Sequence, residues 1–288
     1  MPRRAPPPPL PIWLWSYFSF YLLNFLTTPF YQITTIICKI GAGRLEYHNM
    51  NSNNLAGKFT EPPVKPLSAG EVAAETRARV SRIQEEFTKG FELLRKYPKS
   101  VSFFGSSLFK EDNEHYRTAR RLAGRFAKLG YAIITGAGAG IMEAANRGAF
   151  EAGGQSVGLN IKLPEEQPLN KYLTDSTKFR YFFSRKTVLS FAAEAYLFFP
   201  GGFGTLDEFF EILELLHTKK IFPVPLLLIG SDYWNELDDF IRREVFEKHR
   251  AIEEKDMAIY QIVDDEETII KLVTELPVTD GFSRNLGR

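Results

Sequence analysis

Between residues 100 and 274, short apolar runs alternate with amphipathic stretches of helical length, and this alternation constrains the fold most strongly. The run at 195–199 (AYLFF) has apolar residues at successive positions, which is typical of a strand buried on both faces. Strands that alternate with helices imply a parallel sheet covered by helices on both sides. The sequence therefore predicts an α/β fold, a doubly wound parallel sheet in a single domain.

Four segments follow from this pattern. Ser68 and Glu71 have the spacing of a capping box, so we expect a helix from there to about residue 96. This helix would form an arm N-terminal to the sheet. We divide the chain into an apolar segment at 1–49, a linker and N-terminal helix at 50–98, the α/β domain at 99–276, and a tail at 277–288.

The first segment differs from the rest, because residues 5–38 include no charged residue and no histidine. Its most apolar part, 12–28, is short for a spanning helix, which needs roughly 20 apolar residues. Three interpretations stay open: a membrane anchor, a targeting segment, or a mis-assigned start with translation beginning at Met50. We expect a cytoplasmic protein, or a membrane-anchored one if residues 1–49 are genuine.

The composition argues against nucleic-acid binding, internal disulfides and a metal site. Lys plus Arg total 36 and Asp plus Glu total 35, and this balance gives no general attraction to nucleic acid. A single cysteine, Cys38, excludes an internal disulfide framework. The four histidines lack metal-ligand spacing, so we expect no metal site.

Glycine-rich turns follow two predicted strands, where ligands bind in parallel sheets. Each turn leads into a predicted helix, whose N-terminus offers free N–H groups to a phosphate. We expect Glu208 in the first turn of the second helix. The candidate phosphate- and substrate-binding residues are Gly105, Ser106, Gly136, Gly138, Gly140, Lys186, Gly201, Gly202, Gly204 and Thr205.

Neither turn matches the two commonest phosphate motifs. The spacing at 136–140 places Ile141 where the dinucleotide fingerprint needs its last glycine. Neither glycine turn contains the Gly-Lys-Ser/Thr of a P-loop. The ligand is therefore expected to be a different phosphate compound.

The motif P-G-G-x-G-T-x-x-E at 200–208, preceded by Arg185-Lys186, resembles the LOG family. These are cytokinin riboside 5′-monophosphate phosphoribohydrolases and bacterial relatives that are often mislabelled lysine decarboxylases. The resemblance covers residues 100–221 closely and extends to about 275. It implies a Rossmann-like fold, a homodimer, no cofactor, and Arg185 and Glu208 as the catalytic pair.

The implied reaction is hydrolysis of the N-glycosidic bond of a nucleoside 5′-monophosphate, giving free base and ribose 5-phosphate. A carboxylate at Glu208 would stabilise oxocarbenium character on the ribose and orient or deprotonate water. Arg185 would keep Glu208 ionised or hold substrate oxygens. AMP or an N6-modified AMP, including a cytokinin nucleotide, is the expected substrate.

Two departures from the family's pattern concern the base. Residues 182–184 read Phe-Phe-Ser where the plant enzymes have Met-His-x before the Arg-Lys pair, and Ala137 stands where many members have glycine. The pattern is closer to the bacterial members, for which general nucleotide hydrolysis is expected.

Two other functions compete with this one. A lysine decarboxylase that uses pyridoxal phosphate needs a Schiff-base lysine, and nothing around Lys186 supports one beyond its amine. A non-catalytic nucleotide-binding or sensor protein would keep the glycine turns but would not need both Arg185 and Glu208.

Overall fold

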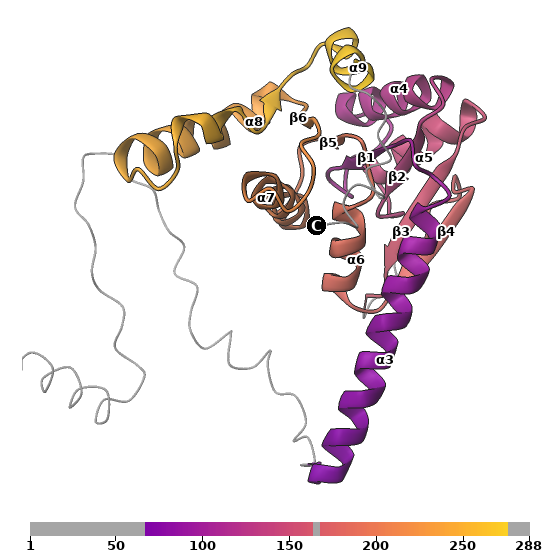
Figure 1. Cartoon of the computed structure of the whole chain (residues 1–288). Helices are drawn as coiled ribbons and strands as arrows, with labels where there is room; N and C mark the ends of the chain where they lie inside the picture. The colour runs from indigo at the N-terminus through magenta and orange to yellow at the C-terminus, as the bar shows by residue number, and fades with distance from the viewer. Residues whose placement is uncertain (1–66, 164–167, 276–288) are drawn as a thin grey trace, which may run out of the picture. The chain divides into compact units, whose positions relative to one another are not determined.

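The computed structural model describes residues 67–163 and 168–275 (Figure 1). The chain divides into two units, Met1–Lys65 and Pro66–Arg288, and the first lies outside the described residues. The apolar segment at 1–49 and the tail at 277–288 are outside them too, so their predictions stay predictions. Within the described ranges, no helix combines the length and apolarity that a membrane span requires.

The predicted parallel sheet is confirmed, and it has seven strands in the order β4-β3-β2-β1-β5-β6-β7. Every pairing is parallel. The chain builds outward from β1 to β4 and then returns to place β5 on the other side of β1. This reversal defines the Rossmann-like, doubly wound class and puts a ligand crevice beside β1. The strands are β1 Ser100–Phe104, β2 Ala132–Thr135, β3 Ser156–Ile161, β4 Asp175–Phe179, β5 Tyr196–Phe198, β6 Leu226–Leu228 and β7 Gln261–Ile262.

Helices cover both faces of the sheet. Helices α4, α5 and α9 contribute to one apolar core, and α3, α6, α7 and α8 contribute to the other. The α8 helix continues as a π-helix, Ile241–Lys248, and a 3₁₀ helix, Glu254–Ala258, precedes β7. The α-helices are α3 Ala69–Leu94, α4 Glu114–Lys128, α5 Ile141–Glu151, α6 Phe182–Ser190, α7 Phe203–His217, α8 Ser231–Phe240 and α9 Glu266–Thr274.

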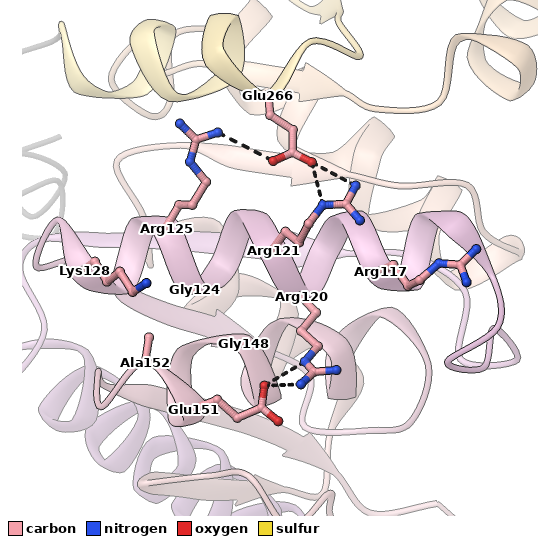
Figure 2. Close-up of a pocket in the computed structure, with 10 residues that line it drawn as sticks. All are labelled: Arg117, Arg120, Arg121, Gly124, Arg125, Lys128, Gly148, Glu151, Ala152 and Glu266. Atoms are coloured by element: carbon pink, nitrogen blue, oxygen red, sulfur yellow. Dashed lines mark hydrogen bonds and ion pairs between the residues drawn. The ribbon is translucent and has the colours of Figure 1, made fainter.

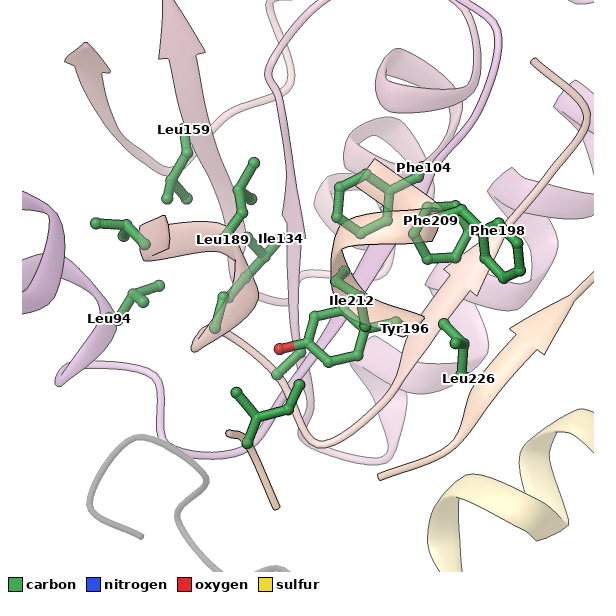
Figure 3. Packing of buried hydrophobic residues seen from close by; sticks show 14 of the residues in the cluster. Leu94, Phe104, Ile134, Leu159, Leu189, Tyr196, Phe198, Phe209, Ile212 and Leu226 are labelled. Carbon is green, nitrogen blue, oxygen red and sulfur yellow. The ribbon is translucent and has the colours of Figure 1, made fainter. Parts of the chain in front are cut away.

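The core on the α6–α7 side is rich in aromatic rings (Figure 3). Phe104 of β1 stacks on Phe198 of β5 at 4.5 Å between ring centroids. Phe209 of α7 meets Phe198 edge-on at 5.7 Å. Because these rings are buried directly below the ends of β1 and β5, they fix α7 on the sheet at the crevice.

The N-terminal helix begins as its capping box predicts. The Glu71 amide donates to Ser68 Oγ at 3.3 Å, and the Ser68 amide donates to Glu71 at 2.8 Å. At its other end, α3 packs against β4 and α6, and Lys96 pairs with Asp175 at 3.0 Å. The helix therefore belongs to the same compact unit as the sheet.

Three elements differ from the sequence pattern. The segment at 175–179 has no apolar run to mark it, yet a full strand forms at Asp175–Phe179 and pairs with β3. Helix α6 begins at Phe182, before the Arg185-Lys186 pair, and α7 begins at Phe203, inside the glycine turn at 200–205. The expectation that Glu208 lies in the first turn of its helix is therefore wrong, because Glu208 falls in the second turn.

Candidate active site

A cavity of about 370 Å³ opens at the carboxyl ends of β1, β2, β3 and β5. This volume is within the usual range of small-molecule sites. Its walls come from the turns after the strands and from the first two turns of α6 and α7. The predicted site residues that line it are Gly105, Ser106, Gly136, Gly138, Arg185, Lys186, Gly202, Gly204, Thr205 and Glu208.

The two predicted catalytic side chains meet in this cavity. The Arg185 guanidinium on α6 donates a hydrogen bond to Glu208 on α7. Their side chains are 11% and 15% exposed, so the pair is largely removed from water. Burial raises the pKa of the Glu208 carboxyl above its ordinary range, and the Arg185 charge opposes this rise. The Nε atom of Arg185 is buried without a hydrogen-bond partner among the described residues.

Lys186 faces carboxylates instead of open solvent. Its ammonium contacts Asp207 at 2.8 Å and Glu211 at 3.3 Å, both on α7. Although burial lowers it, these carboxylates raise the pKa of Lys186 above its ordinary value. A Schiff-base lysine must react as a neutral amine, and this setting stabilises the charged form. Lys186 thus links α6 to α7 and does not fit the residue that a pyridoxal phosphate enzyme needs.

Helix α7 presents an N-terminus with room for an anion. Gly202 at its N-cap has no side chain to offer, and its first turn holds no acidic residue. By contrast, the N-terminus of α8 is satisfied by Asp264, which accepts from the amides of Gly230 and Ser231 at 2.7 and 3.2 Å. The N-terminus of α7 suits a phosphate in this cavity, because its N–H groups are free and its end of the helix dipole is positive.

The two remaining candidate glycines do not line the cavity. Gly140 has φ +67°, and a Cβ there would lie 2.2 Å from the Ser106 carbonyl oxygen. A Cβ at Gly201 would lie 2.2 Å from Thr205 Oγ1. These two positions therefore permit close backbone packing between neighbouring turns, which is the simpler explanation for a glycine at a βα turn.

A buried polar network supports the turn after β2. Ala137 adopts φ +63°, a conformation that side-chain-bearing residues rarely take. Its amide donates to Thr135 Oγ1 at 2.9 Å, and its carbonyl accepts from the Asn170 amide at 3.0 Å. Asn146 joins Thr135 to Asn170 through its side-chain oxygen. This network holds the Gly136–Gly138 backbone in place and compensates for the unusual conformation.

Sequence reasoning missed Asn160, at the end of β3. The residue lines the cavity and is 6% exposed, and its side chain has no hydrogen-bond partner among the described residues. A buried carboxamide normally has hydrogen-bond partners. Because this one has none among the described residues and lies in a cavity wall, it is available to bind a ligand. Ile161, Leu163 and Phe182 give the neighbouring wall its apolar surface. The order β3-β2-β1 puts this wall on the far side of Gly136 from Ser106.

A second cleft, between α4, α5 and α9, is rich in arginine (Figure 2). Arg121 and Arg125 reach Glu266 on α9 at 3.0 and 3.6 Å, and Arg120 reaches Glu151 on α5 at 2.6 Å. Because these cations already pair with carboxylates, little charge remains to attract a phosphate. Exposed pairs of this kind contribute about 0–1 kcal/mol each and join the three helices.

The fold and cavity define a Rossmann-like α/β protein with a buried Arg–Glu pair at the carboxyl edge of its sheet. A family model described as "Possible lysine decarboxylase" matches residues 142–273, a region that includes Arg185, Lys186 and Glu208. Within that class, the chain resembles the LOG family. The predicted resemblance is therefore confirmed.

Two relatives carry the name cytokinin riboside 5′-monophosphate phosphoribohydrolase. The one from Rhodococcoides fascians is 26% identical over 165 residues, which cover 55% of this chain and 79% of that protein. A protein from Oryza sativa subsp. japonica, named as a probable enzyme of this kind, is 29% identical over 159 residues, covering 53% and 62%. These names support a hydrolase at the level of the family.

A solved structure is similar to this one as well. The molybdenum cofactor binding protein from Rippkaea orientalis has a TM-score of 0.46 and 20% sequence identity, with coverage of 62% of this chain and 96% of that one.

The Arg185–Glu208 pair predicts a pH dependence for any reaction that needs the Glu208 carboxylate. Because burial raises the pKa of Glu208, activity should rise with pH through a midpoint above the usual glutamate range. Replacing Arg185 by Gln removes the charge that lowers this pKa, so the midpoint should move to higher pH. Arg185→Lys keeps the charge and should move it less.

The measurement is the pH profile of kcat/KM for wild type and both variants. Lys186 lowers the same pKa and Asp207 raises it, and both residues stay unchanged in this series. A midpoint that stays fixed or moves to lower pH in Arg185→Gln would show that Arg185 does not control Glu208.

Proposed function

We propose that the protein hydrolyses the N-glycosidic bond of a nucleoside 5′-monophosphate, AMP or an N6-modified AMP, to free base and ribose 5-phosphate. The observation that carries this proposal is the buried Arg185–Glu208 pair in the same cavity as the uncapped N-terminus of α7. The pair suits cleavage at a sugar carbon, and the helix start suits the phosphate. The names of the two relatives support the same activity.

The 5′-phosphate would bind at the start of α7. The amides of Phe203, Gly204 and Thr205 form its first turn, where an α-helix leaves its N–H groups without internal partners. The Ser106 hydroxyl lines the same side of the cavity and can donate to a phosphate oxygen. Fixing the phosphate here would hold the ribose against the charged pair.

The base would lie toward the end of β3. Asn160 offers one donor and one acceptor to a purine edge, a pattern that matches the adjacent amino group and ring nitrogen of adenine. Leu163 and Phe182 supply apolar surface beside it. This arrangement favours a 6-aminopurine nucleotide, with or without an N6 substituent.

The reaction would break the bond between C1′ and the base nitrogen, and the electron pair of that bond would leave with the base. The base takes up a proton, and the oxygen of a water molecule bonds to C1′ and loses a proton. Glu208 would stabilise the positive charge on the ribose and orient or deprotonate the water. Arg185 would keep Glu208 ionised and in position.

Two further parts of the proposal concern the setting of the enzyme. Phe182, Phe183 and Phe203 are 56%, 51% and 93% exposed around α6 and the start of α7. Such clustered apolar surface supports the homodimer that the family resemblance implies.

A cytoplasmic location is proposed because the whole chain contains a single cysteine.

Product analysis of the full chain tests this function. With AMP or N6-prenylated AMP, we expect equal amounts of free base and ribose 5-phosphate. Adenosine lacks the phosphate that positions the sugar, so its cleavage should be at least about 100-fold slower. AMP that binds without base release would overturn the enzyme and favour a non-catalytic nucleotide-binding protein. Equal rates for AMP and adenosine would overturn the phosphate site.

A further inference from the structure

Helix α6 carries Arg185 but has no cap within its own sequence. Its N-cap residue, Tyr181, makes no side-chain capping bond, and its first turn contains no acidic residue. The preceding segment must nevertheless be held in place, because Arg185 lies only one turn into the helix. A free helix start would allow α6 to fray and the guanidinium to move.

Glu86, on α3, supplies the missing acceptor. Its carboxylate accepts hydrogen bonds from the backbone amides of Arg180 and Tyr181 at 2.6 and 3.3 Å. It also accepts a hydrogen bond from the hydroxyl of Ser184, which is fully buried in the first turn of α6. One carboxylate thus satisfies three donors at the start of α6, and its charge complements the positive end of the helix dipole.

Close packing between α3 and α6 reinforces this contact. A Cβ at Gly90 of α3 would lie 2.8 Å from Val188 Cγ2 of α6, so the two helices touch through a glycine. Nearer the start of α6, Arg82 Nε donates to the Tyr181 hydroxyl at 3.4 Å. Helix α6 therefore cannot shift along α3 without breaking several contacts at once.

We infer that Glu86 is a positioning residue for the proposed nucleotide hydrolysis, which acts by holding the start of α6 so that Arg185 meets Glu208. This inference rests on the proposed function. Helix α3 lies outside residues 142–273, the region that the family model matches. The N-terminal helix is consequently part of the apparatus that shapes the active site, although it contributes no residue to the cavity wall.

Neighbouring glutamates provide a matched pair of variants. Glu85 is 60% exposed and pairs with Lys89 on the same helix, so Glu85→Ala changes the charge of α3 without touching α6. Glu86→Ala should lower kcat/KM for AMP roughly 10- to 100-fold, the scale of a small misplacement of a catalytic group. Glu86→Gln keeps one acceptor oxygen and should fall between wild type and Glu86→Ala. Glu85→Ala should match wild type.

A double-mutant cycle separates positioning from general destabilisation. If Glu86 acts through Arg185, then Glu86→Ala should have no further effect in an Arg185→Ala background. An equal loss in both backgrounds would overturn the inference, as would Glu85→Ala and Glu86→Ala losing activity alike.

Hydrogen exchange gives a readout that does not depend on catalysis. The amides of Arg180 and Tyr181 should exchange faster in Glu86→Ala than in Glu85→Ala, because only the first variant removes their acceptor. If wild type releases no base, the proposed function fails, and the exchange rates still decide whether Glu86 holds α6. Unchanged exchange at both amides would overturn the anchoring role whatever the activity.

Discussion

Glu208→Gln should lower kcat for base release from AMP by about 100- to 10,000-fold while the protein still binds AMP. The substitution preserves the size of the side chain and its ability to accept a hydrogen bond from Arg185. It removes the negative charge, which is needed to stabilise positive charge on the ribose and to accept a proton from water. General acid–base catalysis contributes on this scale. Steady-state kinetics together with calorimetric AMP binding would measure both quantities.

Glu214→Gln is the matched control for this prediction. Glu214 lies on the same helix, is 67% exposed and does not line the cavity, so its neutralisation should leave base release unchanged. A Glu208→Gln enzyme with nearly wild-type kcat would remove the carboxylate from the mechanism. Loss of AMP binding in this variant, in contrast, would mean that Glu208 supports the ligand rather than the reaction.

Short-range patterns allowed much of the fold to be predicted. The capping box at Ser68 and Glu71 forms as expected. The all-apolar run at 195–199 becomes β5, an inner strand that pairs with β1 and β6. These features depend on neighbours within a few residues, so they are legible in one sequence.

Long-range contacts explain what the pattern could not reveal. The start of α6 at Phe182 is satisfied by Glu86, which lies 95 residues away from Tyr181 in the chain. Strand β4 alternates between exposed and partly buried polar residues, since it is an edge strand that pairs only with β3. No apolar run marks such a strand.

The cavity residues also divide into those that a short sequence motif marks and those that only the folded structure reveals. Arg185 and Glu208 could be chosen because their motif resembles that of a known family. Asn160 could not be chosen in this way, because a single asparagine at the end of a strand belongs to no recognisable motif. Its importance appears only when burial and the absence of a described partner are seen together.

From the sequence, the glycine turns are expected only to bind phosphate. In the structure their glycines have two roles, to open the cavity and to let neighbouring turns pack closely. Gly202 and Gly204 open the start of α7 to the cavity, whereas Gly140 and Gly201 allow turns to pack on one another. At Gly140, the Ile141 amide donates to the Ser106 carbonyl at 2.9 Å, which docks the turn after β2 on the turn after β1. Packing at this position therefore shapes the site from outside it.

Gly140→Ala should consequently cost far more stability than Gly153→Ala. Both glycines have positive φ, +67° and +72°, so an alanine costs about 1–3 kcal/mol in backbone strain at each, and ψ −129° places Gly140 outside the left-handed helical region as well. At Gly153 no other atom lies within 4 Å of the new Cβ, whereas at Gly140 the Ser106 oxygen lies at 2.2 Å and Ser107 Cα at 2.7 Å. Overpacking against backbone should add about 1–3 kcal/mol.

Urea denaturation of the two variants measures this difference directly, through the midpoint at constant slope. Because Ser106 must move to admit the new methyl group at Gly140, base release should fall in that variant and stay near wild type in Gly153→Ala. Equal unfolding free energies for the two variants would mean that the turns can separate without cost. In that case Ser106 would not be held by this contact, and its place beside the start of α7 would need another cause.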